Sequence, residues 1–293
     1  MKIGAIQLDL ISDGSLWLDG GAMFGVVPKP LWGKGTFSDS KNRIRLGLNC
    51  LLIRSPEKII LIDTGCGHKY TPKQLQIYNI EHEAGLLGEL SACGLGPEDV
   101  DVVVNTHLHF DHCGGNTVLH DGNVTATFPN ATYMLRRAEY EAACNPNPRT
   151  QSTYLPHNWE VLTATGQLQL IDEDREIIPG VSLIGTPGHT TGHQSVKITS
   201  DEQTVFYMAD LCPTQAHAPL PWIMSFDLYP MTTMDTRRTI YRKAIQEDWL
   251  LLFEHDPNKP AGYLMEDQGT YKVRPHTWVP GAETDPGVLT KED

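Results

Sequence analysis

Four side chains that commonly bind metal ions lie within the segment Thr-His-Leu-His-Phe-Asp-His at residues 106–112. They are His107, His109, Asp111 and His112. Imidazole and carboxylate groups suit zinc, iron, cobalt and manganese. A lone histidine is more often an ordinary core or surface residue, but three histidines and an aspartate this close together are costly to bury without a cation. The segment therefore predicts a metal site directly after the apolar run at 100–104.

Three further polar residues closely follow apolar runs later in the chain. They are His189, Asp210 and His255. Each of them alone reads more simply as a turn residue or a helix cap. Because strand ends meet at the edge of a sheet, the three together with the 106–112 segment predict a larger ligand set. One loop offers too few ligands for two metal ions, whereas the combined set offers enough.

Short apolar runs and amphipathic stretches must position these side chains. We expect residues 3–14 and 15–21 to pair as an antiparallel hairpin. Further strands are expected at 46–53, 58–63, 100–104, 124–128, 131–135, 168–171, 181–185, 194–198, 204–208 and 249–253. Helices are expected near 82–94, 137–144 and 235–246. This order predicts an α/β (α+β) protein in which two sheets pack face to face and helices lie outside.

Composition limits the class of protein. The chain has 293 residues and 40% hydrophobic content, enough for one large domain over residues 1–293, and no break in composition divides it. Its net charge of −13 disfavours nucleic acids and anionic membranes as partners. No apolar run reaches the ~20 residues of a membrane span or has the form of a secretory signal. We therefore expect a cytoplasmic protein.

The cysteine spacing and three segments of unusual composition also carry structural expectations. The six cysteines lack a Cys-x-x-Cys spacing, so we expect reduced and mostly buried thiols. The apolar, Gly- and Pro-rich residues 20–35 either pack as core or form a wall beside a site or a dimer partner. Residues 145–160 are polar and Pro-rich, as in a surface loop or lid. Residues 276–293 are expected to form an extended tail.

The ligand pattern, together with the Asp-Thr-Gly turn at Asp63, resembles the metallo-β-lactamase superfamily over most of the chain. The resemblance implies an αββα sandwich with two metal ions at one edge. One ion would be held by His107, His109, His189 and Asp210. The second would be held by Asp111, His112, Asp210 and His255. Asp210 would then bridge two divalent ions, for which zinc is expected and iron, cobalt or manganese also suit, while Asp63 would support the metal loop from behind.

Other features of the sequence argue against several branches of that superfamily. Bacterial β-lactamases generally lack the bridging Asp, and diiron reductases replace the second His of the motif with an acid. Hydroxyacylglutathione hydrolases need a helical domain after the last strands, but only 38 residues (293 − 255) follow His255. Transfer-RNA 3′-processing nucleases need a basic surface, which a net charge of −13 disfavours. The remaining resemblance is to the quorum-quenching N-acyl-homoserine lactonases, particularly their YtnP-like members, and rests on residues 20–32, 106–112 and 208–217.

That resemblance implies a metal-dependent carboxylic ester hydrolase that opens a lactone ring, and a homodimer. Asp111 would orient the nucleophile and shuttle a proton. Better-known lactonases place a Tyr at the position of Pro213, so His217 or Tyr229 is the candidate replacement, with an ordinary surface or core role as the alternative. The acyl-chain groove is expected to be lined by Met23, Phe24, Val26 and Trp32. Two alternative functions stay open: an aryl-ester or phosphotriester hydrolase of the same fold, and a metal- or ligand-binding protein without turnover.

Overall fold

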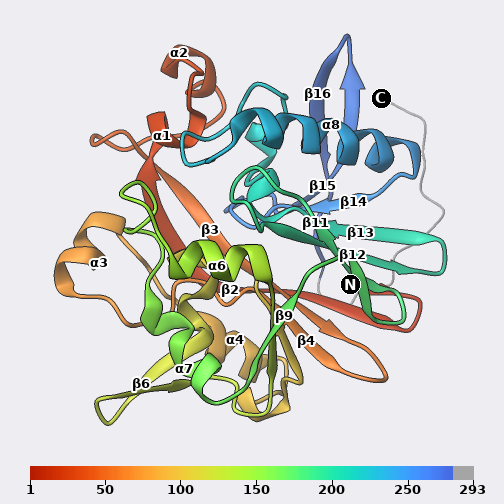
Figure 1. Ribbon diagram of the computed structural model, residues 1–293. Helices are drawn as coiled ribbons and strands as arrows, with labels where there is room; N and C mark the ends of the chain where they lie inside the picture. The colour runs from red at the N-terminus through yellow and green to blue at the C-terminus, as the bar shows by residue number, and fades with distance from the viewer. Residues whose placement is uncertain (280–293) are drawn as a thin grey trace.

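Two seven-stranded β-sheets pack face to face in the computed structural model, which describes residues 1–279 (Figure 1). The first sheet consists, in spatial order, of β1 (Lys2–Ile3), β2 (Ile6–Asp19), β3 (Arg43–Arg54), β4 (Ile59–Ile62), β5 (Val102–Val104), β8 (Thr132–Arg136) and β9 (Leu168–Ile171). The second consists of β10 (Arg175–Ile178), β11 (Val181–Gly185), β12 (Gln194–Ser200), β13 (Gln203–Tyr207), β14 (Leu250–Leu252), β15 (Ala261–Asp267) and β16 (Thr270–Pro275). A small separate hairpin joins β6 (Thr117–His120) to β7 (Asn123–Ala126).

Helices cover the outer faces of both sheets, which confirms the predicted αββα sandwich. The helices are α1 (Gly20–Phe24), α2 (Lys29–Trp32), α3 (Pro72–Tyr78), α4 (Gly85–Ala92), α5 (Phe110–Cys113), α6 (Arg137–Cys144), α7 (Glu160–Ala164) and α8 (Pro230–Gln246). Helices α4, α6 and α7 pack on the first sheet, and α8 packs on the second. No described helix is long and apolar enough to cross a membrane.

Strand alternation explains why the central strands are apolar on both faces. In β5, Val102 and Val104 point into the layer between the sheets, while Val103 points toward the outer helices. In β14, Leu250 and Leu252 lie in the same inner layer, while Leu251 packs against α8. Because each sheet is buried on both sides, these strands read as unbroken apolar runs.

The predicted pairing of residues 3–14 with 15–21 is wrong, because β2 pairs at its start with the short β1 and otherwise with β3. Residues 6–19 form one 14-residue strand that pairs along its length with β3. The register shifts between Ser12 and Ser15, and Gly14 has a φ of 115°. The Asp-Gly turn signal is therefore used by a β-bulge, where an extra residue bends the strand without reversing it.

Other boundaries also differ from the sequence-based expectation. Helix α8 begins at Pro230 instead of residue 235, because proline suits the first turn of a helix. The β15–β16 hairpin was not predicted at all. The expected tail at 276–293 lies mostly outside the described residues, although His276 still donates a backbone hydrogen bond to Ala261. All six cysteines are free thiols and four are buried, as expected.

Candidate metal centre

The seven candidate ligands come from loops at one edge of the sandwich. His107, His109, Asp111 and His112 follow β5 of the first sheet, whereas His189, Asp210 and His255 lie in loops that flank β11–β14 of the second. Strand β5 runs parallel to β4, and β14 runs parallel to β13. The ends of these parallel pairs meet at the same edge, so ligands distant in the sequence converge there.

Asp63 contacts the 106–112 loop, which carries four of the candidate ligands. It follows β4 and adopts a φ of 55°. Its Oδ1 accepts a hydrogen bond from the Thr106 backbone N–H at 2.8 Å, and its Oδ2 accepts one from the Thr106 hydroxyl at 2.6 Å. The same carboxylate lies 3.2 Å from Nδ1 of His112. Asp63 therefore fixes the start of the loop and one of its candidate ligands together.

The first cluster combines His107, His109, His189 and Asp210, all of them buried. Nδ1 of His109 lies 3.0 Å from Nε2 of His107 and 3.0 Å from Nε2 of His189. Oδ2 of Asp210 lies 3.0 Å from Nε2 of His189 and 3.7 Å from Nε2 of His107. Three imidazole nitrogens and one carboxylate oxygen thus surround one small volume.

The second cluster combines Asp111, His112 and His255. Nε2 of His255 lies 3.2 Å from Nε2 of His112 and 3.8 Å from Oδ2 of Asp111. Asp210 joins the two clusters, because its Oδ1 lies 3.2 Å from His255 and its Oδ2 lies 3.5 Å from His112. The geometry is that of a carboxylate placed between two adjacent ion sites.

The hydrogen bonds around the histidines fit metal ligation. Nδ1 of His189 faces Oδ1 of Asp227 at 2.8 Å, and Nδ1 of His255 faces the Gly47 carbonyl at 2.8 Å. These acceptors place the proton on Nδ1, so that the Nε2 lone pair points into the cluster. Ring nitrogens about 3 Å apart repel each other unless a cation, either a proton or a metal ion, lies between them. Oδ1 of Asp210 is also buried without a hydrogen-bond donor among the described residues, which a divalent ion would satisfy.

The candidate histidines of the metal-free chain fall into two groups, one with a lowered pKa and one with a raised pKa. Burial lowers the pKa of His107 and of His109 well below the usual value, so both stay neutral. Burial also opposes protonation of His189 and His255, but Asp210 raises the pKa of His189 to about 10 and that of His255 to about 9. Burial alone would raise the pKa of Asp210, yet His189, His112 and His255 hold it well below its usual value. Protons at these sites must therefore leave when metal ions bind.

Two supporting carboxylates were missed by the sequence reading. Asp227 contacts His189, and Oε2 of Glu254 lies 3.0 Å from Nδ1 of His112. Glu254 directly precedes His255 in the sequence, so the Phe-Glu-His-Asp run offered a signal for it. Asp227 is separated from His189 by 38 residues and follows no apolar strand, so nothing local marked it.

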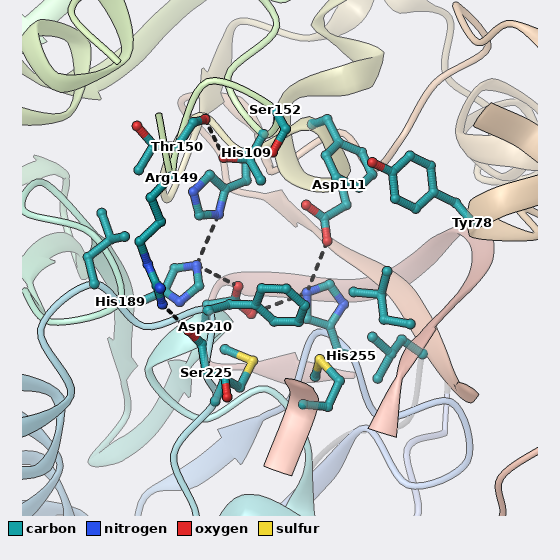
Figure 2. Close-up of a pocket in the computed structure, with 18 residues that line it drawn as sticks. Tyr78, His109, Asp111, Arg149, Thr150, Ser152, His189, Asp210, Ser225 and His255 are labelled. Carbon is teal, nitrogen blue, oxygen red and sulfur yellow. Dashed lines mark hydrogen bonds and ion pairs between the residues drawn. The ribbon is translucent and has the colours of Figure 1, made fainter. Parts of the chain in front are cut away.

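A cavity of about 440 Å³ opens above the two clusters (Figure 2). Part of its wall is apolar and part is polar. The apolar wall consists of Leu18, Met23, Leu46, Phe110, Met224, Phe226 and Leu228, with Tyr78 beside it. The polar wall consists of Arg149, Thr150, Ser152 and Thr153. His109, Asp111, His189, Asp210 and His255 also line the cavity.

Only Met23 of the expected groove residues lines this cavity. Phe24 and Trp32 are buried beneath it and stack on each other with ring centroids 5.0 Å apart. Val26, in the turn between α1 and α2, is 89% exposed. The 20–35 segment therefore divides between core and surface.

Neither His217 nor Tyr229 lies at the cavity. His217 is fully buried, donates a hydrogen bond from Nε2 to the Met23 carbonyl at 2.9 Å, and stacks on Phe24 at 4.5 Å. Tyr229 precedes α8, is half-exposed, and accepts a hydrogen bond from the Thr191 hydroxyl. His217 supports the wall below Met23, and Tyr229 contacts the outside of the 189–193 loop.

Comparisons with known proteins agree with this geometry. The family model of the Metallo-beta-lactamase superfamily matches residues 44–257. An N-acyl homoserine lactonase of Bacillus sp. is 32% identical over 165 residues, which are 52% of this chain and 58% of that protein. The chain thus matches less than two thirds of the length of this curated relative. The N-acyl homoserine lactonase AttM of Rhizobium radiobacter is 27% identical over 63% of this chain and 68% of its own length.

Solved structures resemble nearly the whole chain. A probable metal-dependent hydrolase from Staphylococcus aureus has a TM-score of 0.85 and 34% identity, covering 95% of this chain and all of that one. The dizinc quorum-quenching lactonase AidC has a TM-score of 0.81 over 95% of this chain and 97% of its own, but at 22% identity it shows the fold alone. The family and these relatives point to a metal-dependent hydrolase. The match over residues 44–257 and the shared αββα sandwich show that the chain belongs to the metallo-beta-lactamase superfamily.

Proposed function

We propose that the protein is a dinuclear metal-dependent hydrolase that opens the lactone ring of N-acyl homoserine lactones. The observation that carries this proposal is a pair of ligand clusters that share Asp210 at the base of a half-apolar cavity. A substrate with a polar ring and an apolar tail matches such a cavity. The lactonases among the relatives support the same class of substrate.

In this proposal each cluster holds one divalent ion, with zinc expected. His107, His109 and His189 would hold the first ion, Asp111, His112 and His255 would hold the second, and Asp210 would contribute to both. Two ions there would supply a hydroxide nucleophile at neutral pH and polarise an ester carbonyl. The residues of the chain then have to orient the substrate and move one proton.

Asp111 is the proposed proton carrier. Asp111 lines the cavity and is 8% exposed, so its carboxylate can contact both a bound metal ion and the substrate. Ring opening adds one water molecule: the new C–O bond forms at the carbonyl carbon, and the ring C–O bond breaks. Asp111 takes the proton released by the nucleophile and returns it to the departing alkoxide, giving the N-acyl-homoserine acid.

The polar wall offers a replacement for the Tyr that is missing at Pro213. Arg149 lines the same cavity as His189 of the first cluster (Figure 2). It donates one hydrogen bond to the Ser225 carbonyl, which leaves other N–H groups for a substrate. We assign the carbonyl contact to Arg149 and the acyl chain to the wall of Leu18, Met23, Leu46 and Met224.

Hydrolysis assays separate this proposal from its nearest alternative, an aryl-ester or phosphotriester hydrolase. Metal-replete protein is given N-acyl homoserine lactones with short and long acyl chains, and a pH indicator reports the acid released. Paraoxon and an aryl acetate are assayed in parallel, with His109→Ala as the metal-site control. We expect kcat/KM for the lactones to exceed that for both other substrates and to fall at least 100-fold in the control. Inert lactones with active esters would leave the metal site in place and overturn the substrate.

Three properties stay predictions from the sequence: a single domain over residues 1–293, a homodimer and a cytoplasmic location. The experiment for the dimer is the molar mass in solution. The exposed Val26 and Leu31 of the 20–35 segment are the positions to change if a dimer forms.

A further inference from the structure

A buried carboxylate outside both ligand clusters contacts three segments that build the site. Glu139 lies in the first turn of α6 and has no exposed surface. Its Oε1 accepts hydrogen bonds from the Leu108 backbone N–H at 3.1 Å and from the Tyr154 hydroxyl at 2.9 Å. Its Oε2 accepts one from the Thr190 hydroxyl at 2.6 Å. Glu139 does not line the cavity, so it has no access to a substrate.

Each of the three partners belongs to a functional segment. Leu108 stands between His107 and His109, and Thr190 directly follows His189. Tyr154 ends the segment whose residues 149–153 form the polar wall of the cavity. One carboxylate thus connects three parts of the site: the two loops that carry the histidines of the first cluster, and the polar wall of the cavity.

Two independent contacts show that these segments are packed around Glu139. His109 and Tyr154 form an isolated backbone β-bridge, and their rings lie 5.2 Å apart. A Cβ at Gly192 would lie 2.2 Å from the backbone N of Glu139. The glycine in the Thr-Thr-Gly run therefore lets the 189–193 loop pass close to the start of α6.

We propose that Glu139 is a positioning residue that holds the first ion cluster and the polar cavity wall as one unit. A buried carboxylate costs free energy unless donors satisfy it, and here all three donors come from the parts of the site that must be aligned. The inference rests on the proposed metal cluster and not on a lactone substrate. Without the carboxylate, Leu108 and Thr190 lose their shared acceptor, and the three histidines lose their relative placement.

Metal affinity measured without substrate tests this role. Cobalt(II) is titrated into metal-free protein against a chromogenic chelator, and the visible spectrum of the bound cobalt is recorded. We expect Glu139→Ala to weaken binding at one of the two sites by about 10- to 100-fold and to change the cobalt spectrum. Glu139→Gln is the matched control, because its amide oxygen can still accept from Leu108 and Tyr154 while its NH2 donates to the Thr190 hydroxyl. It should retain affinity within a few-fold of the wild type.

Tyr154→Phe separates the wall from the cluster. It removes only the hydroxyl that ties the 149–153 wall to Glu139. We expect an unchanged cobalt spectrum and a several-fold higher KM with little change in kcat, for whichever ester the protein hydrolyses. An unchanged KM would overturn the connection between Glu139 and the cavity wall.

The positioning role is overturned if folded Glu139→Ala binds cobalt with wild-type affinity and spectrum. Equal losses in Glu139→Gln and Glu139→Ala would also overturn it, because the charge and not the placement would then matter. If Glu139→Ala does not fold, Thr190→Val takes its place. That variant should weaken cobalt binding by a few-fold, and unchanged binding would count against the proposal. None of these cobalt affinities depends on the substrate, so they test the role of Glu139 even if the lactone assignment is wrong.

Discussion

At the scale of single residues, three of the candidate ligand histidines have an outer nitrogen that faces an acceptor. Asp227 faces His189, the Gly47 carbonyl faces His255, and Asp63 faces His112. Such partners fix the tautomer and the orientation of a ligand imidazole. The ligand residues could be predicted from the sequence because they cluster in one motif or follow apolar strands. Among their partners, Asp63 was expected from the family resemblance, whereas Asp227 and the Gly47 carbonyl could not be predicted, because those contacts depend on the tertiary arrangement.

Asp227→Asn should weaken metal binding at the first cluster. Asparagine keeps the shape of the side chain but removes the charge that orients and polarises His189. We expect the Kd for zinc at one site to rise about 10- to 100-fold, measured by competition with a chelator. Asp235→Asn on the exposed face of α8 is the matched control and should bind as the wild type does. Equal affinity in both variants would contradict the assigned role.

His217 should make the metal-free protein less stable in acid. Burial lowers its pKa to about 3 in the folded chain, whereas an unfolded histidine titrates near 6.5. Between these values the unfolded chain binds more protons, so stability falls as pH decreases from about 6.5 toward 3. We expect the free energy of unfolding of His217→Gln to fall less steeply, by roughly 1.4 kcal/mol per pH unit. Urea unfolding of both metal-free proteins between pH 4 and 7 measures it, and parallel curves would refute the assignment.

At the scale of elements, the central strands were predictable and the irregular connections were not. Strands β4, β5 and β14 are short, apolar runs bounded by polar residues, so their pattern indicated them directly. The bulge in β2 was mistaken for a turn because Asp-Gly serves both structures equally well. The groove residues at 24–32 were misplaced because apolar composition does not tell an inward side chain from an outward one.

Gly14→Ala tests the bulge. Gly14 has a φ of 115°, and a Cβ there would lie 2.0 Å from the Glu81 carbonyl oxygen. Strain and overpacking together should lower the free energy of unfolding by about 2–4 kcal/mol. Gly122→Ala is the control, because its φ of 80° is also strained but nothing lies within 4 Å of the added Cβ. Chemical denaturation of both variants should show the larger loss at Gly14, and equal losses would exclude the predicted clash.

At the scale of the whole molecule, the two sheets meet at the site. Four candidate ligands follow a strand of the first sheet, and three lie in loops of the second. Metal ions bound there would connect the two sheets, so the fold and the site depend on each other. The sandwich could be predicted from the order of the elements, together with the family resemblance. The cavity could not, because its walls come from segments as distant as Leu18 and Leu228.

Whether two metal ions act together at Asp210 is tested most directly by a zinc titration of metal-free protein while N-acyl homoserine lactone hydrolysis is followed. We expect activity to rise to a plateau at two equivalents of zinc per chain, and Asp210→Asn to abolish that plateau. A plateau at one equivalent, or hydrolysis that does not depend on added zinc, would contradict the account.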